Sequence, residues 1–187
     1  MLDNILLLSW DQDLLSTPPL DTEIQKILTS QAYMAYPNEN ISLRIVTEMF
    51  SLQRKILKKN LRPQDYNDDL LYSNCKALHI DDYNLLVVPL PHQQILGLIF
   101  DLESNPLDYR NELVRLLNEY LLAQFLQSSP NDADQNRLLL LTLFIDLRKY
   151  GSELTSYQEP ENKVQTFNGI PMVKTFVYGL NNAGKSS

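Results

Sequence analysis

Apolar stretches separated by polar segments divide the first part of the chain into elements of the length of strands and helices. The run NILLLSW at 4–10 predicts a buried first strand. Residues 11–20 contain a pair of prolines and predict a loop. Residues 22–36 are ambiguous between helix and strand. Their isoleucines and Leu28 have the spacing of a helical face.

Apolar residues recur three and four positions apart over residues 41–59, which predicts an amphipathic helix. The residues on or near its apolar face are Ile45, Val46, Met49, Phe50, Leu52, Ile56 and Leu57. Three strands are expected to follow, at residues 70–80, 83–90 and 94–102. Pro106 occupies a favoured first helical position and predicts a helix that continues to residue 127.

A further helix is expected at residues 134–150, where the run LLLLTLFI at 138–145 is apolar around much of the helix circumference. A helix of this kind is either sandwiched in the core or used as an interface, and we expect it to contribute to a protein interface. Glutamate at Leu140 or Leu143 is then expected to change oligomeric state or partner binding while the fold survives.

The polar residues of 151–161 predict a linker. After it, residues 163–167 and 170–178 predict a hairpin with a tight turn at Asn168-Gly169. The elements together predict the α/β (α+β) class, with an antiparallel sheet packed against helices. The predicted division of the chain is a domain at 1–150, a linker at 151–161 and the start of a second domain at 162–187.

The charge of the chain and its few cysteine and histidine residues argue against several kinds of ligand and cross-link. Acidic residues outnumber basic ones by 23 to 16, and this argues against nucleic acid as a partner, since binding phosphates needs basic surface. Cys75 is the single cysteine, so no internal disulfide is expected, and its apolar surroundings predict a buried structural thiol. His79 and His92 lack metal-ligand spacing, and no metal site is predicted from them.

No membrane or secretory segment is predicted. The longest apolar run is far shorter than a membrane span, and the N-terminus lacks the basic residues of a signal peptide, so a cytoplasmic protein is expected. Five of the sixteen basic residues lie within 54–62. They favour a solvated helix end whose cations suit the helix dipole. A peripheral contact with acidic membrane lipid or with an acidic partner is the alternative.

The last nine residues, GLNNAGKSS, fit the phosphate-binding loop G-x-x-x-x-G-K-[ST] and follow a predicted strand at 173–178. In such a loop, backbone N–H groups and the lysine hold phosphates, and the serine hydroxyl binds Mg²⁺. Here the lysine is Lys185 and the metal ligand is Ser186. The predicted nucleotide-binding residues are Gly179, Asn182, Ala183, Gly184, Lys185, Ser186 and Ser187. No catalytic residue is identified.

The loop resembles the first motif of Arf-like small GTPases, G-L-D-x-A-G-K-[ST], with Asn181 in place of the aspartate. The resemblance covers residues 173–187 and implies that the parent protein binds GTP or GDP with Mg²⁺. The D-x-x-G and N-K-x-D motifs of that family are expected beyond Ser187. A permuted arrangement is rejected, because the upstream string at 162–165 lacks the aspartate. The chain by itself is expected to bind no nucleotide and to be inactive.

The order of elements in 1–150 resembles the longin/roadblock type of α/β module, which would place its second strand in 22–36. That family acts as a platform for protein partners, so the resemblance implies a regulatory or dimerisation module ahead of a GTPase. One alternative is an N-terminal extension of another P-loop NTPase or kinase. A second alternative is a scaffold with a degenerate GTPase part.

Overall fold

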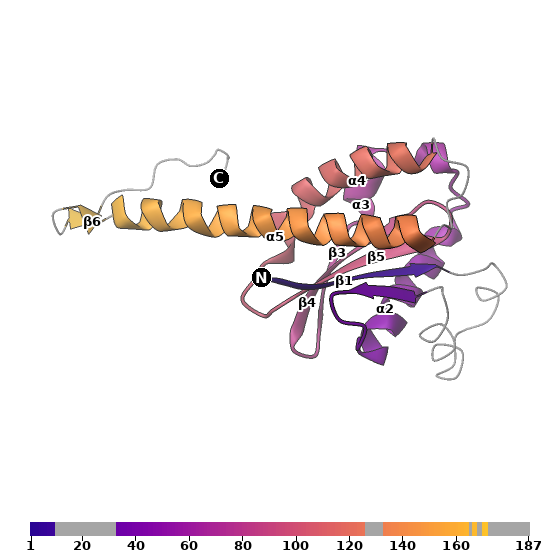
Figure 1. The fold of residues 1–187 in the computed structure, drawn as a ribbon, viewed down its shortest axis with the longest axis horizontal. Coiled ribbons are helices and arrows are strands. Elements are labelled where there is room, and N and C mark those ends of the chain that lie inside the picture. Colours follow the sequence, from indigo (N-terminus) through magenta and orange to yellow (C-terminus); the bar gives the residue numbers. More distant parts are fainter. Residues whose placement is uncertain (10–32, 126–132, 165, 168–169, 172–187) are drawn as a thin grey trace. The chain divides into compact units, whose positions relative to one another are not determined.

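Five antiparallel strands form the sheet at the centre of the chain's first unit, Met1–Lys149 (Figure 1). The computed structural model describes residues 1–9, 33–125, 133–164, 166–167 and 170–171. The strands are β1 (Leu2–Ser9), β2 (Tyr33–Tyr36), β3 (Lys76–Ile80), β4 (Tyr83–Leu90) and β5 (Gln94–Phe100). They lie in the spatial order β2-β1-β5-β4-β3, so β5 is central and is buried along its whole length.

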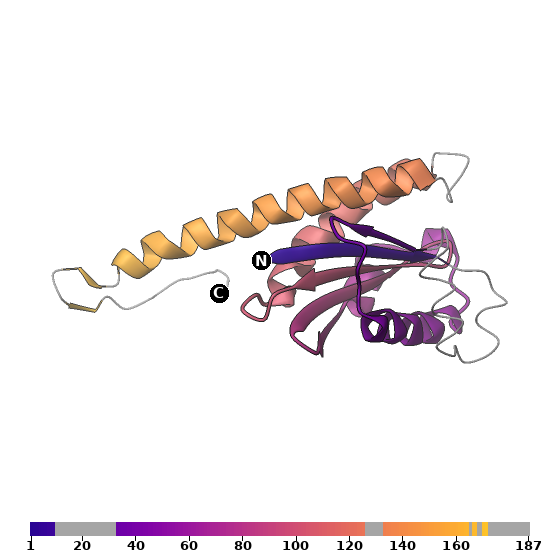
Figure 2. The same ribbon diagram turned by 60° about the horizontal axis from the view of Figure 1, so that its bottom comes forward.

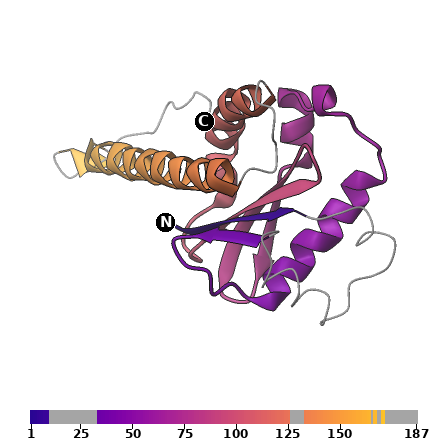
Figure 3. The same ribbon diagram turned by 45° about the vertical axis from the view of Figure 1, so that its right-hand side comes forward.

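Helices cover both faces of this sheet. Those described are α2 (Leu43–Leu57), α3 (Asp68–Asn74), α4 (Arg110–Phe125) and α5 (Ala133–Val164), with short 3-10 turns η2 (Pro63–Asp65) and η3 (Pro106–Tyr109). Figures 2 and 3 show α2 and α4 on opposite faces of the sheet. The Phe144 ring of α5 meets the Tyr36 ring of β2 edge to face, with 5.2 Å between centroids. No helix in the described ranges is long and apolar enough to cross a bilayer.

Alternation along the strands supplies one apolar layer to each side of the sheet. The layer beneath α2 is a cluster of Leu6, Leu8, Tyr33, Ile45, Val46, Met49, Phe50, Ile80, Leu85, Val87, Ile95 and Ile99. Gly97, at the middle of β5, allows α2 to approach closely. A Cβ at that position would lie 2.7 Å from the Met49 sulfur. The helix begins at Ser42, whose hydroxyl accepts a hydrogen bond from the Arg44 N–H.

The sequence predicted most of these elements. The α/β class with an antiparallel sheet packed against helices is confirmed. Of the ambiguous stretch 22–36, the last four residues form β2, and residues 22–32 lie outside the described ranges. The helix predicted from Pro106 begins as the 3-10 turn η3 and becomes α-helical at Arg110.

The predicted strand at 70–80 is wrong in its first half. Residues Asp68–Asn74 form α3, and only Lys76–Ile80 is strand. The Asn67 side chain accepts a hydrogen bond from the Leu70 N–H at 2.9 Å, which is the geometry of a helix N-cap. Asp68 and Asp69 then place negative charge in the first turn, where the helix dipole favours it.

The second unit, Tyr150–Ser187, contains the continuation of α5 and a short hairpin. The linker predicted at 151–161 is helical and belongs to α5, which continues to Val164. The strands β6 (Thr166–Phe167) and β7 (Ile170–Pro171) pair antiparallel. The predicted strand at 173–178 lies outside the described ranges, so its relation to a GTPase domain stays a prediction.

Candidate functional site

The seven predicted nucleotide-binding residues all lie outside the part of the chain that the structure describes. They are Gly179, Asn182, Ala183, Gly184, Lys185, Ser186 and Ser187. The phosphate loop and the Mg²⁺ ligand therefore stay predictions from the sequence motif. Among the described residues, no group of three or more His, Cys, Asp or Glu side chains could hold a metal ion.

One side of α5 presents apolar side chains to solvent. Leu138 is 63% exposed and Ile145 is 55% exposed. They are seven positions apart, which places them on the same side of the helix, two turns from each other. Leu141 and Thr142 lie between them on this side and are half-buried. We refer to Leu138, Leu141, Thr142 and Ile145 as the outer stripe of α5.

The two leucines expected at the interface lie on the opposite side of the helix. Leu140 is 2% exposed and Leu143 is fully buried, so both belong to the core. The expectation that glutamate at these positions leaves the fold intact is therefore wrong. An ionised carboxylate without a partner cannot be buried there at an acceptable free-energy cost. On α5, the exposed apolar residues that could form an interface are those of the outer stripe, Leu138 and Ile145.

A hydrogen bond links α5 to α4. The Tyr120 hydroxyl of α4 donates a hydrogen bond to Asp146 Oδ2 of α5 at 2.9 Å. Desolvation by burial, followed by this contact with a carboxylate, raises the pKa of Tyr120 to about 12. The phenol therefore stays protonated, and able to donate, throughout the physiological range.

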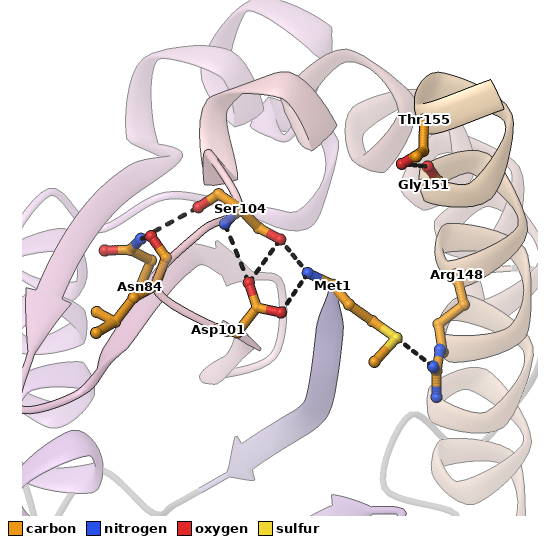
Figure 4. A network of polar contacts seen from close by, with 8 residues as sticks. Met1, Asn84, Asp101, Ser104, Arg148, Gly151 and Thr155 are labelled. Atoms are coloured by element: carbon orange, nitrogen blue, oxygen red, sulfur yellow. Dashed lines mark hydrogen bonds and ion pairs between the residues drawn. The ribbon is translucent and has the colours of Figure 1, made fainter. Parts of the chain in front are cut away.

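A polar network joins the start of β1 to the turn after β5 (Figure 4). The Met1 ammonium donates to Asp101 Oδ2 at 2.8 Å and to the Ser104 hydroxyl. The Ser104 N–H donates to Asp101 Oδ1 at 3.0 Å, and the Asn84 amide donates to the Ser104 carbonyl at 3.1 Å. The ammonium lowers the pKa of Asp101, although burial opposes this effect. The Arg148 guanidinium contacts the Met1 sulfur.

The Ser104 hydroxyl also donates to Asp101 Oδ1 at 2.9 Å. Together these hydrogen bonds tie the start of β1 to the turn after β5. This network was not predicted from the sequence. The spacing Asp101-x-x-Ser104 directly after an apolar strand is a turn signal that could have pointed to the Asp101 contacts.

The structure also describes the surroundings of Cys75, Asp68, Asp81 and His79. Cys75 is buried, and desolvation raises its pKa to about 12, which confirms the prediction of a structural thiol. Asp81 pairs with Arg44 at 2.7 Å, and Asp68 accepts a hydrogen bond from Asn118. The His79 Nδ1 lies 3.0 Å from Asn84 Oδ1.

Comparison with protein-family models, with curated proteins and with solved structures finds no match to this chain. The functional interpretation therefore depends on the sequence motif at the C-terminus and on the surfaces of the N-terminal unit.

Proposed function

We propose that this chain is the N-terminal regulatory and interaction module of a small GTP-binding protein, with the guanine-nucleotide phosphate loop at 179–187. The observation that carries the proposal is the motif Gly179 to Ser186 directly after a predicted apolar strand. In the intact parent, Lys185 would face the outer phosphates and Ser186 would bind Mg²⁺. The setting we propose is cytoplasmic.

The order of the described elements supports a module of the longin/roadblock type. That resemblance requires a second strand within 22–36, and β2 lies at Tyr33–Tyr36. The resemblance also requires a helix, three strands and two helices after that strand. The structure has this order, with α2 followed by β3, β4, β5, α4 and α5. The extra helix α3, between α2 and β3, is a departure from the simplest pattern.

The outer stripe of α5 supports an interaction role. Leu138 and Ile145 are exposed on a helix that buries Leu139, Leu140, Leu143, Phe144 and Leu147. Contiguous exposed apolar patches mark protein interaction sites, and we propose that the outer stripe is part of such a patch. The proposed partner is a protein or a second copy of this chain.

The nucleotide part is tested by titration calorimetry of the parent protein with GTP and Mg²⁺. Lys185→Ala should abolish nucleotide retention, because it removes the cation that faces the outer phosphates. Ser186→Ala should weaken binding through the loss of the Mg²⁺ ligand. Lys174→Ala, which removes the same charge from the predicted strand, is the matched control. Undiminished GTP affinity in the Lys185 variant would contradict the proposal.

The interaction part is tested by light scattering and partner capture with Leu138→Glu and Ile145→Glu. Both side chains already contact solvent, so the fold should survive, while dimerisation or partner binding should be lost. Arg137→Glu, an exposed change on another side of the same helix, is the control for added negative charge. Unchanged dimerisation and partner binding in both Leu138→Glu and Ile145→Glu would exclude the outer stripe as the interface.

Nucleotide preference separates the alternatives. A parent that binds ATP in place of GTP would be another P-loop NTPase or kinase. A parent that binds neither nucleotide would be a scaffold with a degenerate GTPase part.

A further inference from the structure

The C-terminal end of α2 carries a concentration of positive charge that the nucleotide proposal does not use. Between Ser51 and Gln64 there are five cations and no acid, whereas the other eleven basic residues are dispersed among all 23 acids of the chain. The five are Arg54, Lys55, Lys58, Lys59 and Arg62. We refer to them as the basic end of α2.

Most of these cations are available to a partner. Lys55, Lys58, Lys59 and Arg62 are exposed, and Arg54 is half-buried. Arg62 pairs with Asp65 at 3.3 Å, and none of the three lysines forms an ion pair within the described ranges. The Arg54 Nε is buried without a hydrogen-bond partner. Within the described ranges, the three lysines and Arg54 are thus four neighbouring cations without a carboxylate partner.

The helix dipole accounts for only part of this concentration. Arg54 and Lys55 lie in the last turn, where cations interact favourably with the dipole. Lys59 and Arg62 lie beyond the end of α2 at Leu57, and the chain leaves the helix through Asn60 at φ 53°. The dipole effect is confined to the terminal turn, so it gives no reason for cations that continue past it.

The position of α2 makes these side chains accessible to an extended surface. Figure 3 shows α2 on the face of the sheet opposite α4, with no other described helix packed over it. Ile45, Met49 and Ile56 of α2 are buried in the core. The exposed side chains of the basic end are charged, so the contact that they offer is electrostatic.

We propose that the basic end of α2 is a peripheral contact site for anionic membrane lipids. Among the described residues, no hydrogen bond or ion pair holds the long, flexible side chains of the three lysines in a fixed geometry. Such charges suit the diffuse negative charge of a lipid surface. Recognition of a defined carboxylate or phosphate group in a protein more often uses the planar fork of arginine, fixed by neighbouring groups.

The net charge of −7 does not prevent this contact. At physiological ionic strength, charges are screened over about 8 Å, so acids on distant faces contribute little repulsion. The same net charge opposes an extended polyanion that would run along the acidic surface, and this disfavours nucleic acid. Each lysine near an anionic bilayer strengthens binding about five-fold.

The test is co-sedimentation of the full chain with phosphatidylserine-rich vesicles and with neutral phosphatidylcholine vesicles. The test variant carries Lys55→Gln, Lys58→Gln and Lys59→Gln, since glutamine nearly matches lysine in helix propensity. The control variant carries Lys76→Gln, Arg137→Gln and Lys149→Gln, which are exposed positions with the same total loss of charge. A double variant with Lys58→Gln and Lys59→Gln changes only residues beyond the end of α2, should the triple variant fail to fold.

We expect the unmodified chain to bind the anionic vesicles, to ignore the neutral ones and to dissociate at high salt. The triple variant should lose about a hundred-fold in partitioning, and the double variant about twenty-five-fold. The control variant should bind as the unmodified chain does. Equal binding to both kinds of vesicle, or binding that survives removal of the lysines, would overturn the proposal. Failure to bind anionic vesicles, together with binding to a polyglutamate peptide, would overturn it in favour of an acidic protein partner.

Discussion

Replacement of Gly97 by alanine tests the close packing of α2 on the sheet. Gly97 lies opposite Leu6 of β1 and Val87 of β4, in the middle of the central strand. An added Cβ would lie 2.7 Å from the Met49 Sδ and 2.8 Å from the Met49 Cε, both well below contact distance. Met49 is fully buried, so its side chain has to shift within a packed core.

Two opposing effects set the size of the change. Alanine in a strand restricts the unfolded chain more than glycine does, which stabilises the fold by about 0.5–1 kcal/mol. Overpacking of a core costs about 1–3 kcal/mol. The thioether of Met49 is flexible and relieves part of the overlap. We therefore expect Gly97→Ala to lower the free energy of unfolding by about 1 kcal/mol.

A double-mutant cycle isolates the contact with Met49. Met49→Ala alone should cost about 2–5 kcal/mol, because it leaves a cavity under α2. In that background the Cβ of Ala at position 97 meets no overlap, so Gly97→Ala should become neutral or stabilising. Urea denaturation of the four proteins, followed by circular dichroism, measures the cycle. If Gly97→Ala costs the same with and without Met49, steric overlap is not the cause.

Three further predictions concern titratable groups. The pKa of Asp101 is lowered from 3.8, so its stabilising effect is complete above pH 3.8 and is lost as the pH falls through the pKa of the folded state. Asp101→Asn should therefore reduce the loss of stability at acid pH, as measured by urea denaturation at a series of pH values. An unchanged loss of stability at acid pH would contradict this. Cys75, with a pKa raised to about 12 and a buried side chain, should react with iodoacetamide far more slowly in the native protein than in urea; equal rates would show that the thiol is exposed. Tyr120→Phe should lower the free energy of unfolding by about 1 kcal/mol through loss of the hydrogen bond to Asp146. In an ultraviolet titration, the variant should have one fewer phenol that ionises near pH 12. An unchanged titration would contradict the raised pKa of Tyr120.

The spacing of apolar residues in the sequence predicted the strands and helices that bury one or both of their faces. The apolar runs of β4 and β5 gave correct strands, and the helical spacing of Ile45, Met49 and Ile56 gave α2. The error at α3 has a local cause. Apolar residues around Leu70 favoured a strand, but Asn67 and the two following aspartates are a helix start that the sequence contains.

The strand β2 could not be identified from local pattern alone. It is four residues long, and its pairing with β1 brings together Leu8 and Tyr33 across a long intervening segment. Whether so short a segment becomes a strand depends on the free edge of β1, which is a property of the folded sheet. The phosphate loop is the opposite case, since its identification depends on residue spacing and needs no tertiary partner.

The helix α5 shows why periodicity could indicate an interface and still select the wrong residues. Its buried side includes the polar Asn136 along with Leu140 and Leu143, whereas Leu138 and Ile145 face solvent. Apolar residues on both sides give no single apolar direction, so the sequence leaves the orientation open until the sheet is present. Glutamate at Leu140 or Leu143 would disrupt the core and could not distinguish packing from assembly. Glutamate at Leu138 or Ile145 leaves the core intact, and a change in assembly would then be attributable to the outer stripe.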